Sequence, residues 1–403
     1  MLMRFPKLTD LDAEQMRIYS GAPPTGSVIV VGPPGTGKTV MAFHRAAYLE
    51  ARGKLQPNKA MVPRVLMYSK VLSTYTAGRD GVAPTVATST LHKWVYEWWR
   101  LMFGRKPPPH CADDAYAFNW TSIVTQVLIS SGMLQRRQHW GHLIIDEGQD
   151  FPPDMYRALS AISSAMVEED IDARPAITVF ADENQRLSET RNSTIQEIET
   201  ALSLPEGRRY ALKRNYRNTL QIAAFVRHFY VGLPSGIPDL PVRVGTAKPK
   251  VVLARSGIEV ARRRIALYAK NNPDKDVGVI CMADSVRRRC FNSLCTRLAG
   301  SNIVVQTYSN KEREEHPPEA LKFDCGGSVT VLNAQSAKGL EFDSVFVIDP
   351  LVDAGGASLQ QARMQLYVTA SRPRDYLELI LMNPPDDYLN LLPESETYDF
   401  IEE

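Results

Sequence analysis

The chain has 403 residues, of which 44% are hydrophobic and 23% are charged, and its formal net charge is +2. This length accommodates two domains of ordinary size, and the composition excludes a disordered or fibrous protein. The small net charge excludes binding to nucleic acid through a generally basic surface, so any such binding requires a local groove.

Short apolar runs alternate with longer helical stretches along the chain. In the first half these runs are residues 27–31, 64–68, 142–145 and 176–180. In the second half they are residues 277–281, 328–332, 345–348 and 377–381. Fully apolar strands separated by helices are typical of parallel sheets that helices cover on both faces. The pattern therefore predicts an α/β protein with two such sheets.

The two groups of strands are separated by a candidate linker that contains Pro205 and Gly207. We therefore expect one domain over residues 1–204 and a second over residues 205–403. The 54 positions between His92 and Asp146 leave room for a small helical insert at about 93–140. The 47 positions between Cys281 and Ser328 leave no room for a comparable insert in the second domain.

A glycine-rich segment follows the first apolar run and precedes a helical stretch. It fits the pattern GxxxxGK[ST] and consists of Gly32, Pro33, Pro34, Gly35, Thr36, Gly37, Lys38 and Thr39. Glycines allow backbone N–H groups to surround a phosphate at a helix N-terminus. Lys38 adds a cation there, and the hydroxyl of Thr39 is a ligand for Mg²⁺. The segment predicts a site for ATP and Mg²⁺.

Two carboxylates end the apolar run at residues 142–145. Asp146 and Glu147 are expected at the carboxyl edge of the sheet, where open α/β folds bind ligands. Neighbouring residues of a strand point in different directions, so Asp146 can hold Mg²⁺ while Glu147 orients and deprotonates the attacking water.

The segment Asp146-Glu147-Gly148-Gln149-Asp150 resembles the DExQD box of the UvrD/Rep-like superfamily 1 helicases. Further boxes follow in that family's order. Ala181 to Gln185 resembles GDxxQ, Leu212 to Arg217 resembles LxxNYR, Ala337 to Phe342 matches KGLEF, and Leu366 to Arg372 resembles YVAxTR. The resemblance implies two RecA-like domains that bind ATP between them.

The resemblance also assigns roles around the nucleotide. Gln15 would read the adenine, and Tyr216 would pack near the base. Gln185 would link the γ-phosphate to the nucleic-acid site. Glu341, two residues after Gly339 of the same box, would bond the ribose. Arg217 and Arg372 would act as arginine fingers from the second domain.

Other positions resemble the family's contacts with single-stranded nucleic acid. These candidates are Ser69, Thr90, His92 and Arg191, together with Asn333 and Gln335, which stand where the family usually has Thr and His. Several positions depart from the family pattern: Val40, Ser188 and Thr190 stand where relatives carry side chains that stack on bases. Stacking on aromatic side chains contributes about 1–3 kcal/mol per base, so base stacking is in doubt while the ATP chemistry is not.

Three other features each allow two interpretations. The aromatic segment with Trp94, Trp98 and Phe103 has the spacing of a helix that buries one face, but its cations also suit a single-stranded track. The basic triplets at residues 262–264 and 287–289 are either a solvated face or phosphate contacts. The last 29 residues carry nine acidic and no basic side chains, and form either a frayed tail or a docking segment.

The resemblance implies an ATP-dependent translocase or helicase on single-stranded nucleic acid, with DNA favoured over RNA. Lys338-Gly339 is typical of the UvrD-like branch and so implies 3′-to-5′ movement. The alternative is a non-translocating ATPase subunit that controls a partner such as a nuclease in repair or anti-phage defence. No signal peptide and no run near the ~20 residues of a membrane span is apparent, so we expect the protein in the cytoplasm.

Overall fold

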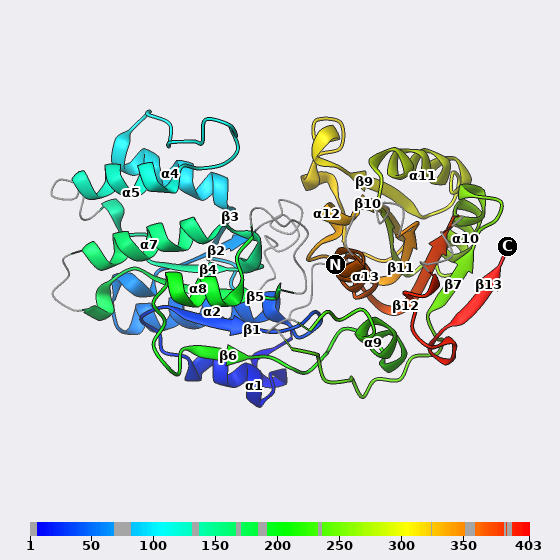
Figure 1. Ribbon diagram of the computed structural model, residues 1–403, viewed down its shortest axis with the longest axis horizontal. Helices are drawn as coiled ribbons and strands as arrows, with labels where there is room; N and C mark the ends of the chain where they lie inside the picture. Colours follow the sequence, from blue (N-terminus) through cyan, green and yellow to red (C-terminus); the bar gives the residue numbers. More distant parts are fainter. Residues whose placement is uncertain are drawn as a thin grey trace.

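The computed structural model describes residues 6–67, 82–130, 137–166, 171–183, 192–232, 236–323, 325–350, 359–382, 384 and 389–403. Two sheets lie side by side, and each is flanked by helices (Figure 1). All pairs of neighbouring strands in both sheets are parallel. The predicted fold class, two RecA-like α/β domains, is confirmed.

The first sheet has the strand order β3-β2-β4-β5-β1-β6. Its strands are β1 (Val28–Val31), β2 (Pro63–Met67), β3 (Ala87–Thr90), β4 (His142–Ile145), β5 (Ala176–Ala181) and β6 (Arg209–Ala211). Its helices are α1 (Ala13–Met16), α2 (Lys38–Leu55), α4 (Leu91–Phe103), α5 (Trp120–Ile129), α7 (Pro153–Ala165) and α8 (Ile195–Ala201). The residues of β1, β4 and β5 are all buried, as their apolar sequences predict.

The second sheet has the strand order β13-β7-β12-β11-β8-β10-β9. Its strands are β7 (Lys250–Leu253), β8 (Asp276–Cys281), β9 (Val304–Tyr308), β10 (Ser328–Asn333), β11 (Phe342–Ile348), β12 (Pro373–Leu381) and β13 (Asp399–Glu402). Its helices are α9 (Leu220–Arg227), α10 (Ile258–Asn271), α11 (Asp284–Arg297), α12 (Ala334–Ala337) and α13 (Leu359–Ala370). The described residues between β8 and β10 form α11, β9 and two short 3-10 helices, and they include no large insert.

The short strand β6 follows the expected domain boundary but belongs to the first sheet. It pairs with β1 through Ile29 and Arg209, Val30 and Tyr210, and Val31 and Ala211, so it belongs to the first sheet. We therefore propose that the domains divide after Ala211 rather than after residue 204. Sequence alone did not reveal β6 because its three residues lie at a sheet edge and form no apolar run.

The aromatic segment of the first domain belongs to the core. Trp94, Trp98 and Trp99 on α4 are buried, and the first two rings stack with their centroids 5.4 Å apart. The indole N–H of Trp98 donates a 2.9 Å hydrogen bond to the carbonyl of Gln138. Of the two interpretations, the buried helix face is therefore correct.

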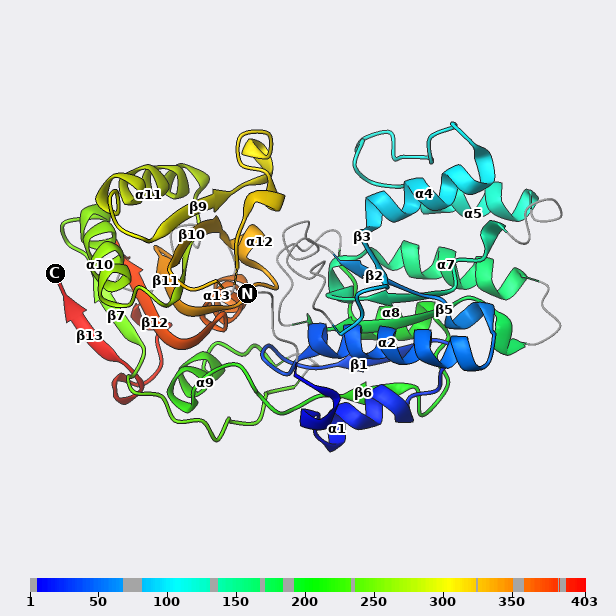
Figure 2. The ribbon, with the colours of Figure 1, turned by 180° about the vertical axis from the view of Figure 1, so that it is seen from behind.

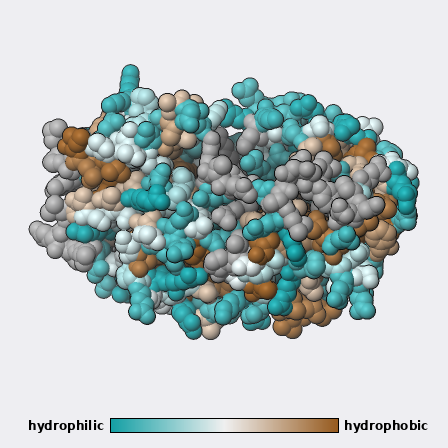
Figure 3. All heavy atoms as spheres, viewed as in Figure 1, coloured by the Kyte–Doolittle hydropathy of each residue, from teal (hydrophilic) through white to brown (hydrophobic). Residues whose placement is uncertain are grey.

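Figure 3 shows apolar side chains over the end of the molecule where α5 lies, and Ile129 of α5 is exposed.

The basic triplets form ion pairs within the protein. Arg287 is fully buried and binds Asp284, Glu312 and the hydroxyl of Thr307. Arg264 on α10 is partly buried and binds two carboxylates. These arginines are therefore structural, because their hydrogen bonds are used inside the fold.

The acidic C-terminal segment ends in a strand rather than a frayed tail. Strand β13 pairs in parallel with β7 at the outer edge of the second sheet (Figure 2). Glu403 binds Arg263 and Arg264, and Glu402 binds Arg255. The sequence left open whether this acidic segment is a frayed tail or docks on a partner. Its last carboxylates bind arginines of the same chain. In the described residues, no helix has the length and apolarity needed to cross a membrane.

Replacing Arg264 should destabilise the second domain. Its Nε lies 2.5 Å from Glu378, which is buried, and its Nη1 lies 2.5 Å from Glu403. Arg264→Met leaves Glu378 buried without its cation, so we expect the free energy of unfolding to fall by about 3 kcal/mol. The control Arg255→Met removes the exposed pair with Glu402 and should change it by less than about 1 kcal/mol. Urea unfolding measures both, and equal losses would contradict the buried-pair argument.

Candidate nucleotide-binding site

The glycine-rich segment joins the end of β1 to the start of α2, as predicted. Gly35 and Gly37 have φ angles of +79° and +83°, which residues with a Cβ rarely adopt. A Cβ on Gly35 would also lie 2.5 Å from the side-chain oxygen of Asn215. The first turn of the 18-residue helix α2 therefore begins directly at the loop, and its free N–H groups suit an anion.

Lys38, the first residue of α2, is folded over this loop. Its Nζ donates hydrogen bonds to the carbonyls of Gly32 at 2.7 Å and Pro33 at 3.1 Å, and it lies 3.8 Å from Asp182. The hydroxyl of Thr36 donates to the same Pro33 carbonyl at 2.8 Å. The ammonium is thus buried beside the helix N-terminus, where it complements a phosphate.

Thr39 and Asp146 meet as the predicted metal-ligand pair. The Thr39 hydroxyl donates a 2.7 Å hydrogen bond to Oδ2 of Asp146, whereas Oδ1 of this buried carboxylate has no hydrogen-bond partner. Burial, together with the neighbouring charge of Glu147, raises the pKa of Asp146 to about 7. A hydroxyl, a carboxylate and an unsatisfied buried oxygen fit Mg²⁺, which prefers oxygen ligands and favours the ionised form of Asp146.

Glu147 follows in a left-handed backbone conformation, with φ of +53°. Its carboxylate is buried and accepts a 2.7 Å hydrogen bond from the amide of Gln149. Burial alone would raise its pKa, but the charges of Lys338, Lys38 and Arg372 outweigh burial and lower the pKa to about 2. Glu147 is therefore an ionised acceptor in a fixed orientation, as a residue that orients a water must be.

A buried ion pair connects the two domains next to Glu147. The Nζ of Lys338, after α12, lies 2.6 Å and 2.5 Å from the two carboxylate oxygens of Asp150. Only 2% of the Lys338 side chain and 5% of the Asp150 side chain are exposed. Both residues lie inside family boxes, but the sequence analysis assigned no role to either. Their opposite charges were the one feature of the sequence that could have indicated a pair.

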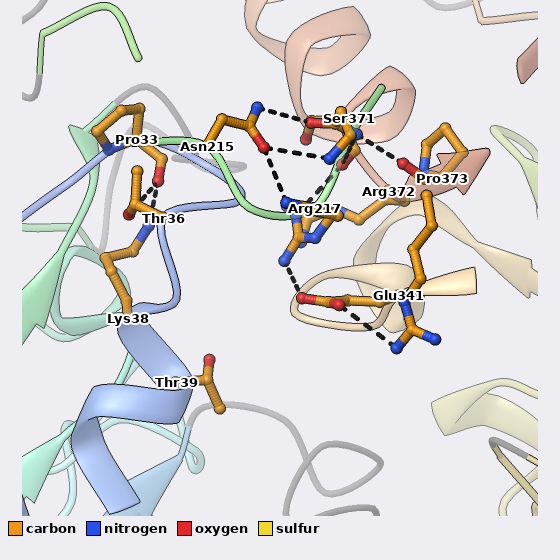
Figure 4. Close-up of polar contacts among 12 residues, drawn as sticks. Pro33, Thr36, Lys38, Thr39, Asn215, Arg217, Glu341, Ser371, Arg372 and Pro373 are labelled. Atoms are coloured by element: carbon orange, nitrogen blue, oxygen red, sulfur yellow. Dashed lines mark hydrogen bonds and ion pairs between the residues drawn. The ribbon is translucent and has the colours of Figure 1, made fainter. Parts of the chain in front are cut away.

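The two predicted arginine fingers approach from the second domain (Figure 4). Arg217 lies 2.5 Å from Glu341 and donates a 3.2 Å hydrogen bond to the carbonyl of Ser371. Arg372 is fully buried, and its Nε donates to the carbonyl of Val368 at 2.8 Å. Burial and the charge of Arg217 lower the pKa of Arg372 to about 10, so it still carries a charge at neutral pH.

The predicted ribose and base residues lie beside Arg217 and the phosphate-binding loop. Glu341 is held by Arg217 and, at 3.6 Å, by Arg374, and Gly339 has a φ of +79°. Gln15 is buried and caps α1, accepting a 3.2 Å hydrogen bond from the backbone N–H of Asp12. Its amide nitrogen would lie 3.2 Å from a Cβ at Gly37, so it lies against the loop.

Tyr216 is the most exposed residue of this group. Its ring is 42% exposed, and its hydroxyl binds Asp12. Its backbone N–H donates a 2.8 Å hydrogen bond to the carbonyl of Gly35. The predicted base-packing residue therefore sits directly beside the phosphate loop with an accessible ring.

The predicted nucleic-acid residues lie at strand ends. Thr90 ends β3 and caps α4, and Asn333 ends β10 and caps α12 with a 2.8 Å hydrogen bond from Ser336. His92 and Gln335 are exposed, and the His92 ring contacts the carbonyl of Tyr116 at 2.7 Å. The carboxyl ends of parallel strands suit ligand binding, but each cap is already a local structural role. Ser69, Gln185 and Arg191 lie outside the described residues.

The Lys338–Asp150 pair should behave as a coupled unit. Lys338→Met and Asp150→Asn each leave a buried charge without its partner, so we expect each to lower stability by about 3–5 kcal/mol. The double variant removes both charges of the pair. Its loss in the free energy of unfolding should therefore be about 1–3 kcal/mol smaller than the sum of the two single losses. Shifts of the urea midpoint measure this cycle. Strict additivity would show that the two side chains do not depend on each other.

Comparisons with known proteins support the family resemblance. Residues 15–191 match the family described as an AAA domain. The chain is 25% identical over 237 residues to DNA helicase II of Rickettsia typhi, a match that covers 49% of this chain. It spans 33% of that relative's length.

Among solved structures, the C-terminal domain of a possible DNA helicase from Lactobacillus plantarum is 20% identical, with a TM-score of 0.32. That match covers 46% of this chain and 98% of the other. The ordered boxes and the match to DNA helicase II together make this chain similar to the UvrD/Rep-like helicases.

Proposed function

We propose that this chain hydrolyses ATP and uses the energy to move along single-stranded DNA. The observation that carries the proposal is the assembly of opposite charges at one interdomain cleft. The first domain contributes Lys38, the Thr39–Asp146 pair and Glu147, and the second contributes Arg217 and Arg372. Phosphoryl transfer depends mainly on positioning and on charge neutralisation by groups of this kind.

Each side chain has a task that follows from its position. Backbone N–H groups at the start of α2 and the Lys38 ammonium bind the phosphates. Thr39 and Asp146 would hold Mg²⁺, which neutralises phosphate charge when bound. Glu147, held by Gln149, would orient the attacking water, and the two arginines would stabilise charge that develops in the transition state.

Movement requires that nucleotide state changes the fit between the domains. Lys338 and Arg372 come from the second domain and face charged groups of the first. Binding and release of a highly charged ligand between them would close and open the cleft. A strand bound across both sheets would then be gripped alternately, and the DNA helicase II likeness favours DNA as that strand.

The direction and the form of the activity follow from the resemblance. The residue pair Lys338-Gly339, typical of the UvrD-like branch, favours 3′-to-5′ movement. The described chain has only the α4–α5 insert and no counterpart between β8 and β10. We therefore propose that the isolated chain separates long duplexes poorly without a partner that engages the duplex.

Two replacements should separate binding from hydrolysis. Lys38→Ala removes a phosphate ligand and should abolish tight binding of ATP or its turnover. Glu147→Gln keeps every phosphate contact, so ATP should still bind while hydrolysis is lost. The control is Lys54→Ala on the same helix, where an exposed lysine pairs only with Glu50. Equilibrium binding of a fluorescent ATP analogue and phosphate release measure the two steps. Unchanged turnover in Glu147→Gln would remove Glu147 from the mechanism.

The proposed movement is tested by stimulation and by strand displacement. We expect single-stranded DNA to increase ATP turnover, and duplexes with 3′ overhangs to be displaced in preference to those with 5′ overhangs. A lack of stimulation by either DNA or RNA would favour the regulatory ATPase instead. Efficient unwinding of long duplexes by the purified chain would contradict the need for a partner, and a 5′ preference would contradict the direction.

A further inference from the structure

Two buried asparagines lie between the arginine fingers. Asn215 and Asn218 are 5% and 1% exposed, respectively. The Asn215 amide nitrogen donates a 2.9 Å hydrogen bond to the side-chain oxygen of Asn218. The two side chains therefore form a single hydrogen-bonded pair.

The first asparagine holds the backbone that carries Arg217. The side-chain oxygen of Asn215 accepts hydrogen bonds from the backbone N–H groups of Arg217 at 3.0 Å and Asn218 at 3.1 Å. These bonds form a tight turn in which the orientation of Arg217 depends on the Asn215 amide.

The second asparagine holds the backbone that carries Arg372. The amide nitrogen of Asn218 donates to the carbonyl of Ser371 at 3.2 Å and to the carbonyl of Pro373 at 2.6 Å. These carbonyls belong to the residues on either side of Arg372 (Figure 4). Two carbonyl acceptors require both N–H donors, so the orientation of the Asn218 amide is determined by its partners.

The same pair is packed against the phosphate-binding loop. A Cβ on Gly35 would lie 2.5 Å from the Asn215 side-chain oxygen and 3.3 Å from Cβ of Arg217. The pair thus links three segments that are distant in sequence: the loop after β1, the segment around Arg217 and the turn around Arg372.

We propose that Asn218 is a positioning residue that, through Asn215, holds Arg217 and Arg372 in register with each other and with the phosphate-binding loop. This inference rests on the proposed ATP hydrolysis. The side-chain amide of Asn218 is neutral and donates to two backbone carbonyls, so it contributes no charge and transfers no proton. Its loss would displace both arginines together, and a displacement of about 1 Å at a catalytic group can cost on the order of 10²-fold in rate.

The test replaces Asn218 by near-isosteric Asp, which places carboxylate oxygens against the carbonyls of Ser371 and Pro373. We expect kcat for ATP to fall on the order of 10²-fold, with KM changed less than about threefold, because phosphate binding by the loop is intact. Asn218→Ala serves as a second variant if the first fails to fold. In an Arg217→Ala background, replacing Asn218 should have a smaller effect, because only Arg372 is left for it to position.

The matched control is Gln306→Glu in the second sheet. Gln306 is also buried, and its amide nitrogen also donates to two acceptors, the carbonyl of Lys322 at 2.6 Å and the hydroxyl of Thr330 at 2.8 Å. It should lose stability but keep kcat. Equal losses of kcat in Asn218→Asp and Gln306→Glu would show that Asn218 matters only for folding and would overturn the inference.

A second readout does not depend on turnover. Amide hydrogen exchange of the nucleotide-free protein should become faster at residues 217–218 and 371–374 in Asn218→Asp, and remain unchanged there in Gln306→Glu. Unaltered exchange at both segments would also overturn the inference. If the wild-type chain has no ATP turnover, the proposed function fails, while exchange still shows whether Asn218 joins the two segments.

Discussion

The arrangement of the two domains depends on charges that are buried between them. Lys338 and Asp150 are both almost fully buried, and burial of either charge without the other is strongly unfavourable. A pair of this kind contributes little net stability compared with apolar residues, but a single unpaired member is strongly unfavourable. It therefore selects the one domain arrangement in which both charges are satisfied. That arrangement also places the Lys338 charge near Glu147 and keeps this carboxylate ionised.

The segment that crosses between the sheets serves both of them. The backbone of Leu212 hydrogen-bonds to Val31 of β1, and that of Tyr216 bonds to Gly35 of the phosphate-binding loop. Two residues later, Asn218 bonds to the turn around Arg372. A change at the loop is thus transmitted within a few residues to the second domain, because the crossing segment is hydrogen-bonded at both ends. We infer that the segment that connects the two domains covalently also transmits movement of the phosphate-binding loop to the second domain.

Features that suggest nucleic-acid binding by composition are partly used for folding. The tryptophans of α4 fill the core of the first domain, and Arg287 is buried in an ion-pair network with Asp284 and Glu312. The acidic end of the chain forms the edge strand β13, where its carboxylates meet the arginines of α10. Aromatic and charged side chains satisfy partners inside a fold with the same interactions that they would use on a ligand. Composition therefore does not distinguish the two uses.

Local patterns in the sequence predicted the main elements and most residues of the candidate nucleotide site. The apolar runs identified β1, β4 and β5, and the spacing of Lys38, Thr39, Asp146 and Glu147 predicted the residues that meet there, because each pattern reports a local preference of the backbone. The short or polar edge strands, such as β6 and β13, were not predicted, since their pairing depends on distant partners. Only the tertiary structure decided which buried polar groups pair over long distances in the sequence. Lys338 with Asp150, and Asn218 with the turn around Arg372, are joined across more than a hundred residues, and no local pattern encodes such a contact.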